Sequence, residues 1–407
     1  MIWKKDFGTE HMKSFEYVLI ATIVFFLIGI TTKNPIPFIA VGVFVTYLIV
    51  YKLYDRSIGK ELYLNNERMT LKLFPGEKSK LTFQLQNHSI FPMINGEFQL
   101  QIGPVINAYQ NREKSLNKYW NYIKIPLSVF KRRKTMVEIP IIAEQRGTTR
   151  IKNIKFLIPH LFCFDSIVLQ FVPFYYTEII VFPKIVPVQG VASVFHMIPG
   201  NGRTNFSPFE DILSPLGTRD YSYSDPFHRI NWKASVKTQA LQTNIYEKVV
   251  DMSFIFIVNL GMSNEANNMK KISENTESLL SYTAYLSQYA TEKGLPFEIV
   301  INARKPGKVP YVNLQEGEGK VHYGRALETL ARINKQSMIT PFHQMLHQVG
   351  KQFLIPKTII MIGEIPAGTN RVIDTWKQGQ KAIYQIQQKG DGAVLKPWTR
   401  EVVTNAN

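Results

Sequence analysis

The chain of 407 residues is predicted to be a multi-domain protein with three structural regions in succession. Two apolar runs near the N-terminus, 14–32 and 36–51, predict a helical hairpin, because Asn34, Pro35 and Pro37 at their junction interrupt a helix. Short segments that alternate polar and apolar residues follow and predict a β-sandwich. The last region alternates apolar strands with amphipathic helices, which is typical of an α/β domain. The predicted parts are a membrane anchor at 1–60, a β-sandwich at 61–187, a connecting segment at 188–250 and an α/β domain at 251–407.

The hairpin is predicted to cross a membrane twice. A helix of about 20 apolar residues spans a bilayer, and each run approaches that length. No small-residue cleavage site follows the first run, which argues against a removed signal peptide. Only Lys33 lies in the turn, whereas basic residues flank both ends of the hairpin: Lys4, Lys5, Lys13, Lys52, Arg56, Lys60 and Arg68. By the positive-inside rule we expect a multi-pass protein of the cell membrane whose soluble domains face the cytoplasm.

The middle region contains strand candidates with turn residues between them. These candidates are 80–87, 98–102, 136–143, 149–156 and 178–182. Short strands at this spacing favour an immunoglobulin-like sandwich. The single cysteine, Cys163, cannot form an intramolecular disulfide, and its neighbours Phe162 and Phe164 predict a small core residue in a strand.

The C-terminal region begins with the apolar run 252–260, which predicts a strand buried on both faces. Further strands are predicted at 296–301, 358–362 and 382–387, and helices at 265–293, 323–333, 341–349 and 370–378. This βαβ alternation predicts a sheet covered by helices.

A polar and aromatic segment precedes this region, and we call it the signature. It contains Arg219, Tyr221, Asp225, Arg229, Ile230, Asn231, Trp232, Lys233 and Ser235. It is too polar for a core strand and too rich in large apolar side chains for a linker, so we expect a surface position with packed aromatics and paired charges. The segment resembles the signature of the bacterial family called domain of unknown function 58, R-x-Y-x-x-G-D-x-x-R-x-I-x-W-x-x-S-A, with Ser224 in place of the glycine.

The resemblance implies a von Willebrand factor A-like fold for the α/β domain. Such domains often bind a divalent cation through Asp-x-Ser-x-Ser after the first strand, with further oxygens from later loops. The matching positions here are Asn259, Gly261 and Ser263, and Glu364 lies in a later loop. Because the carboxylate and one hydroxyl are missing, we expect neither a bound metal nor another cofactor.

The resemblance also implies partners, since relatives are often encoded beside MoxR-type AAA+ ATPases and transglutaminase-like membrane proteins. The expected function is therefore that of a non-catalytic adaptor whose signature residues bind the ATPase, near 259–263. The alternative is a structural clasp in which Trp232 is buried and Arg229 pairs with Asp225 or Glu247.

Two other functions stay open. One is an enzyme with an unrecognised site in the α/β domain. His343 and His347 have the spacing of a zinc-protease motif, but Gln344 stands where the general base would be. The other is a binder of anionic lipid or nucleic acid, since the chain has a net charge of +17. A basic patch at 111–134 concentrates this charge, but no nucleic-acid motif accompanies it, so specific nucleic-acid binding is not expected.

Overall fold

The structure is a computed structural model that divides into two compact units, Met1–Pro183 and Lys184–Asn407. The residues that it describes are 2–7, 10–108, 112–113, 120–163, 165–196, 210–223, 225–248, 253–261, 275–307, 309–334, 337–351, 357–378, 382–390 and 392–399. Each unit is described by itself.

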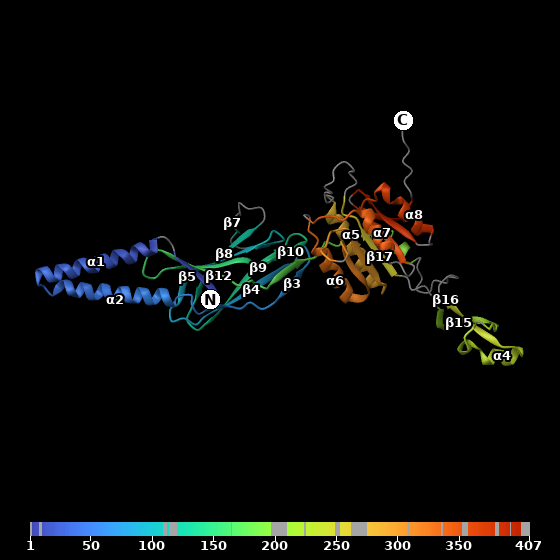
Figure 1. Ribbon diagram of the computed structural model, residues 1–407, viewed down its shortest axis with the longest axis horizontal. Helices are drawn as coiled ribbons and strands as arrows, with labels where there is room; N and C mark the ends of the chain where they lie inside the picture. Colours follow the sequence, from blue (N-terminus) through green and yellow to red (C-terminus); the bar gives the residue numbers. More distant parts are fainter. Residues whose placement is uncertain are drawn as a thin grey trace, which may run out of the picture. The chain divides into compact units, whose positions relative to one another are not determined.

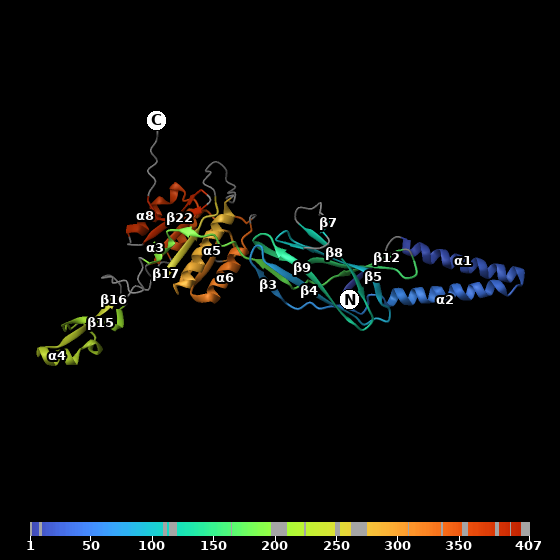
Figure 2. The ribbon, with the colours of Figure 1, turned by 180° about the vertical axis from the view of Figure 1, so that it is seen from behind.

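Two long apolar helices dominate the start of the first unit. Helix α1 covers Glu10–Thr32 and helix α2 covers Ile36–Ser57, and they run side by side as a hairpin in Figure 1 and Figure 2. Lys33 adopts a left-handed conformation (φ 52°) in the turn, and the side chain of Asn34 accepts a hydrogen bond from the Ile36 amide. Both helices are long and apolar enough to cross a membrane, and their most apolar stretches are 6% buried. The prediction of two apolar N-terminal helices is confirmed.

The rest of the first unit, which we call the β domain, is built from strands. They are β1 (Trp3–Phe7), β2 (Leu62–Leu64), β3 (Thr70–Leu73), β4 (Lys78–Asn87), β5 (Met93–Ile102), β6 (Ile106–Ala108), β7 (Arg112–Glu113), β8 (Asn121–Val129), β9 (Lys134–Ala143), β10 (Gly147–Arg150), β11 (Lys152–Pro159), β12 (Ser166–Phe171) and β13 (Glu178–Val181). In the described residues they form sheets with the orders β1-β12-β11-β5-β8-β7, β2-β4-β9-β6 and β10-β13-β3. The predicted strands are present, with 149–156 divided between β10 and β11.

The two larger sheets contribute to one apolar core. Phe83 of β4 and Phe98 of β5 meet edge to face with ring centroids 5.4 Å apart. The core also takes in Tyr54 and Ile58 from the end of α2, and neither is measurably exposed. Strand β1, which precedes the hairpin, pairs with β12 and places Trp3 against Phe171. Residues from the predicted anchor region at 1–60 therefore also build the core of the β domain.

The second unit contains a seven-stranded sheet with the order β14-β22-β21-β20-β17-β18-β19. Its strands are β14 (Val188–Gln189), β17 (Ser253–Val258), β18 (Phe297–Ile301), β19 (Val312–Gly317), β20 (Lys357–Ile362), β21 (Ile383–Lys389) and β22 (Gly392–Pro397). Strands β18, β17, β20 and β21 are parallel neighbours, as the βαβ pattern predicts. Strands β14, β19 and β22 were not predicted, because they lack the continuous apolar or regularly alternating runs of the predicted strands.

Helices cover both faces of this sheet. Helices α5 (Thr276–Glu292) and α6 (Gly319–Ala331) contact each other, whereas α7 (Phe342–Gly350) and α8 (Asn370–Gln378) pack together on the opposite face (Figure 2). Two short helices, α3 (Val191–His196) and η2 (Ala367–Thr369), complete the domain. The prediction of an α/β sheet covered by helices is confirmed, and α5 begins at Thr276, later than predicted. The preceding 262–274 lie outside the described residues.

We predict that Trp3→Ala destabilises the β domain by about 3 kcal/mol, because it removes a large buried side chain from the sheet core. Trp3 is 4% exposed, and its neighbour Phe7 in the same strand is 40% exposed. Phe7→Ala is the matched control and should change the free energy of unfolding by less than about 1 kcal/mol. Denaturant unfolding of the detergent-solubilised chain measures both. Equal effects would show that β1 does not contribute to the core.

Candidate functional site

The signature folds as a small hairpin with a helix at its turn. Its elements are β15 (Glu210–Asp220), the 3₁₀ helix η1 (Phe227–Arg229), α4 (Trp232–Thr238) and β16 (Gln242–Lys248), and the two strands form a sheet of their own. The structure therefore brings the predicted signature residues together in one module, which we call the signature hairpin. Ser224 lies outside the described residues. Whether the hairpin lies near 259–263 stays a prediction.

An ion pair closes the loop after β15. The guanidinium of Arg219 donates two hydrogen bonds to the carboxylate of Asp225, at 2.6 and 2.8 Å. The Ser222 amide donates to the same carboxylate, and the Tyr221 hydroxyl donates to the Asp225 carbonyl. The Arg219 hydrogen bonds, followed by the Ser222 amide, lower the pKa of Asp225 below its ordinary value. Paired charges were predicted here, but the partner of Asp225 is Arg219 rather than Arg229.

A second set of hydrogen bonds joins α4 to β16. Asn231 caps α4 by accepting from the Ala234 amide at 3.0 Å, and its own amide group donates to Asn244. The hydroxyl of Ser235, a buried residue, donates to the Asn231 carbonyl at 2.8 Å and accepts from the Gln242 amide at 2.9 Å. Asn231 and Ser235 therefore brace the hairpin from within.

Several large side chains of the hairpin are exposed to solvent, although Ile230 is buried. Trp232 is 66% exposed, Phe227 is 76% exposed and Val236 is 80% exposed, and Lys233 beside them is also exposed. The expectation that these aromatics are packed down is wrong for Trp232, because the N-terminus of α4 turns its first residue outward. The guanidinium of Arg229 lies 6.0 Å from the ring centroid of Tyr246. The side chain of Glu247, its other predicted partner, lies outside the described residues.

The positions expected for a metal in the α/β domain hold an amide network instead. Asn259, which follows β17, accepts hydrogen bonds from the Gly261 amide at 3.0 Å and from the side chain of Asn302 at 2.7 Å. Its own amide group donates to the Glu364 carbonyl at 2.6 Å. Asn259 is 3% exposed, and these contacts engage both ends of its side chain. Ser263 lies outside the described residues.

A cavity of about 370 Å³ opens at this edge of the sheet. It lies at the carboxyl ends of the central parallel strands, which is where ligands of α/β sheets usually bind. Most polar side chains of its lining are amides, from Asn259, Asn275, Gln385, Gln387 and Gln388, and Glu364 contributes one carboxylate. Gly363 has a φ of 103°, and a Cβ there would stand 2.3 Å from the Asn259 carbonyl, so the two loops approach too closely for another residue.

No group of three or more His, Cys, Asp or Glu side chains arranged for a metal is found within the part of the chain that the structure describes. His343 and His347 lie on α7 and are both exposed. A hard divalent cation prefers several carboxylate oxygens, which the engaged amide of Asn259 does not supply.

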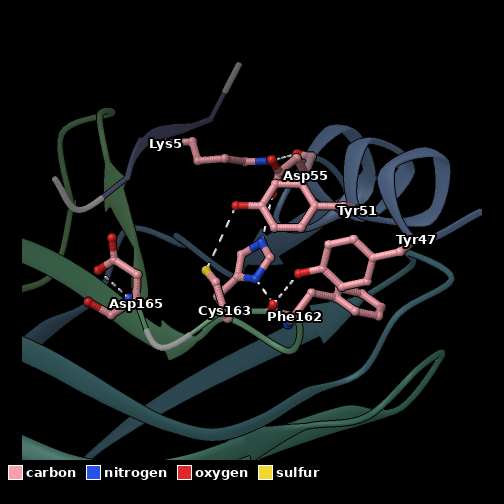
Figure 3. A network of polar contacts seen from close by, with 9 residues as sticks. Lys5, Tyr47, Tyr51, Asp55, Phe162, Cys163 and Asp165 are labelled. Carbon is pink, nitrogen blue, oxygen red and sulfur yellow. Dashed lines mark hydrogen bonds and ion pairs between the residues drawn. The ribbon is translucent and has the colours of Figure 1, made fainter. Parts of the chain in front are cut away.

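A third cluster, not predicted from the sequence, joins α2 to the β domain (Figure 3). The Tyr47 hydroxyl donates to the Phe162 carbonyl, and the Tyr51 hydroxyl lies 3.8 Å from the sulfur of Cys163. Nδ1 of His160 accepts from the Phe162 amide, so its Nε2 carries the proton and donates to Asp55 at 2.9 Å.

Lys5 completes this junction by donating to the Asp55 carbonyl (Figure 3). Burial lowers the pKa of Lys5, and the charge of Asp55 partly offsets the effect. Cys163 lies in the loop between β11 and β12 and is half-buried, so the prediction of a core residue in a strand is wrong. The spacing of Tyr47, Tyr51 and Tyr54, which places them on one helix face, is the sequence signal for this contact.

The predicted basic patch is divided by the strands. Within 111–134, Lys114 and Lys118 lie outside the described residues, and Lys124 belongs to β8. The cations at 131–134 are exposed in and beside the turn between β8 and β9. This turn is the part of the patch that the structure presents at a defined surface.

Comparison with known proteins yields no family assignment. No family model matches the chain, and no curated protein matches it. One solved structure, described by the words "AvmM Catalyzes Macrocyclization in Alchivemycin A Biosynthesis", is similar to 24% of this chain and to 72% of its own length, at 6% identity and a TM-score of 0.17. A TM-score of this size is too low to indicate a shared fold.

We predict that Asn259→Ala lowers the free energy of unfolding by about 1–3 kcal/mol, because the Gly261 amide and the Asn302 side chain lose a buried acceptor. The control Gln387→Ala removes an exposed amide of the same cavity and should stay within about 0.5 kcal/mol. Millimolar Mg²⁺ should leave the melting temperature of the unchanged chain as it is. A cation at 100 times its Kd would add about 2.7 kcal/mol, so a rise of several degrees would contradict this interpretation.

Proposed function

We propose that this chain is a non-catalytic, membrane-anchored adaptor of the domain of unknown function 58 type, which binds a MoxR-type AAA+ ATPase through its signature hairpin. The observation that carries the proposal is the exposure of four side chains on a small module that is braced from within, namely Phe227, Trp232, Lys233 and Val236. A transglutaminase-like membrane protein is the second partner that the resemblance implies.

These four exposed side chains have the composition of a protein-binding surface. Exposed apolar side chains that gather at one place mark interaction sites, and tryptophan contributes more binding energy than most residues where it becomes buried. The Arg219–Asp225 pair and the Asn231–Ser235 brace hold the module in shape, which reduces the entropy lost on binding. A clasp would instead bury Trp232 against its own chain.

An enzyme is the competing function, and the cavity beside Asn259 is the observation that favours it. Carboxamides neither take up nor release protons near neutral pH, so a lining made largely of them is poorly suited to general acid–base catalysis. The amide lining therefore supports the adaptor over the enzyme.

The fold proposal is a membrane hairpin, an immunoglobulin-like β domain and a von Willebrand factor A-like α/β domain. The two apolar helices, the paired β-sheets and the helix-covered parallel strands support it. The basic residues on both flanks of the hairpin support an orientation with the soluble domains in the cytoplasm.

We predict that Trp232→Ala weakens capture of the MoxR-type ATPase tenfold or more, because a buried interface tryptophan contributes about 2 kcal/mol or more. The same change should alter the free energy of unfolding by no more than about 0.5 kcal/mol, since the ring is solvent-exposed. Affinity measured with the purified ATPase and denaturant unfolding of the variant test both parts.

Two variants control this experiment. Tyr176→Ala removes a ring that is 53% exposed on the β domain and should leave capture unchanged. Ser235→Ala removes the brace and should destabilise the hairpin by about 1–3 kcal/mol. Undiminished capture by Trp232→Ala would remove the support for the hairpin as the binding surface.

For the orientation, we predict that a reporter fused after Asn407 is protected from protease in intact cells. The basic flanks at both ends of the hairpin retain those ends in the cytoplasm. A reporter placed in the turn beside Lys33 is the control and should be accessible from outside. Digestion of the C-terminal reporter in intact cells would reverse the assignment.

A further inference from the structure

Helix α2 contacts the β domain over the second half of its length. The tyrosines of one face meet the loop between β11 and β12, where Tyr47 binds the Phe162 carbonyl and Tyr54 packs on Phe162 with ring centroids 5.4 Å apart. On another face the same stretch stays apolar and exposed, since Ile49 is 55% and Leu53 is 56% exposed. The second half of α2 therefore has one face covered by the β domain and another apolar face that is exposed.

The length of α2 brings this end of the β domain to the membrane surface, where headgroup contacts can seat it. The part before Tyr47, residues 36–46, is about 16 Å long at 1.5 Å per residue, which is about half of a bilayer core of about 30 Å. Immersion up to Tyr51, the end of the apolar run, extends the embedded length to about 24 Å. A helix immersed that far carries the loop of Leu161 and Phe162 into the same leaflet, and Leu161 is 51% exposed.

The turn between β8 and β9 is connected to the last turn of α2 through Phe91 and Asn87. Phe91 packs on the ring of Tyr54 at 5.1 Å, and its carbonyl accepts a hydrogen bond from Asn87. The Asn87 carbonyl in turn accepts from the amide of Arg132 in the turn. Through these contacts the turn is linked to the C-terminal end of α2.

The turn combines an apolar side chain with a run of cations. Phe130 is 49% exposed, and it is followed by the exposed residues Lys131, Arg132, Arg133 and Lys134. Among the residues that the structure describes, none of these four cations forms an ion pair. Each is therefore available to a phosphate group.

We propose that this end of the β domain is seated in the bilayer surface, with Leu161 and Phe130 inserted at the interface and the cations 131–134 bound to anionic lipid headgroups. The inference rests on the proposed insertion of the hairpin but not on ATPase binding. Exposed aromatic and basic side chains beside a membrane span have the chemistry of a headgroup contact.

The experiment uses the full chain in vesicles of phosphatidylcholine, alone or mixed with phosphatidylglycerol. Phe130→Cys in a Cys163→Ser background carries a nitroxide, whose accessibility to oxygen and to a water-soluble nickel complex reports its depth. We expect the label to lie in the headgroup layer of the mixed vesicles and to move into water in neutral ones. Raising the salt to about 1 M shortens the Debye length from about 10 to 3 Å and should also release it.

Charge removal at the turn and at a distant part of the β domain, in and around the far end of the β4–β9 pair, provides the matched comparison. The proximal variant combines Lys131→Gln, Arg132→Asn, Arg133→Gln and Lys134→Gln. Asparagine replaces Arg132 because φ is 56° there, and asparagine tolerates that conformation. The distal variant changes Lys72, Lys78, Lys80 and Arg146 to Gln. In the β4–β9 ladder, Lys78 pairs with Ile142 and Gln86 with Lys134, so Lys78 lies about 27 Å from the turn.

The proximal variant should release the label and the distal variant should not, with unchanged melting temperatures for both. The proposal is overturned if the label stays in water in the mixed vesicles, or if neither the lipid charge nor the proximal variant changes its depth. It is also overturned if duplex DNA, and not the anionic lipid, shields the label from the nickel complex. A second label at Ile39, 69% exposed on α2, tests insertion itself. If that label lies in water, both the membrane insertion of the hairpin and the lipid contact of the β domain are contradicted. Loss of ATPase capture alone contradicts neither of these two hypotheses.

Discussion

The packing of Tyr54 and Ile58 into the core of the β domain ties the apolar hairpin to a folded body. Tyr54 lies in the last turn of α2 and Ile58 directly follows the helix, and neither is measurably exposed. Strand β1 enters the same domain from the other side of the hairpin through Trp3. Both ends of the hairpin are therefore attached to the β domain, so insertion of the helices would bring that domain to the membrane surface.

Burial of the ionisable groups at this junction is compatible with their hydrogen bonds to one another and to the backbone. The Asp55 carboxylate accepts from His160, whose other ring nitrogen accepts from the backbone. Unpaired, a carboxylate beside a membrane interior would cost several kcal/mol. The junction thus combines ring contacts around Tyr54 with a hydrogen-bonded Asp55–His160 pair, and it can lie at the boundary between lipid and water.

The signature hairpin and the Asn259 network show opposite uses of polar side chains. In the hairpin, the polar residues Asn231 and Ser235 turn inward, whereas the apolar ring of Trp232 is exposed. This is the reverse of what the burial of apolar surface favours, and such exceptions are expected at functional surfaces. At the sheet edge, Asn259 turns its amide inward and joins the loops that follow two strands. Internal hydrogen bonds there join the loops at the carboxyl ends of the parallel strands.

The sequence by itself determined the elements whose signal is local. The apolar lengths of α1 and α2, the alternation in β4 and β9, and the continuous apolar run of β17 each predicted an element, because side-chain periodicity follows the backbone repeat. The amide of Asn259 at a position where a cation site needs a carboxylate likewise argues against a metal by residue type alone. The residue types of the signature marked the hairpin as unusual.

Only the tertiary structure decided which of these residues meet. The pairing of Asp225 with Arg219, the outward position of Trp232 and the contact between Tyr51 and Cys163 depend on chain paths that no local pattern contains. The pairing of β1, which contains Trp3 and precedes the hairpin, with β12 also could not be predicted from a local pattern, because the two strands are far apart in the chain. Contacts between distant segments depend on packing over the whole domain. The inference that the β domain lies at a membrane surface therefore required the tertiary contacts of Tyr47 and Tyr54.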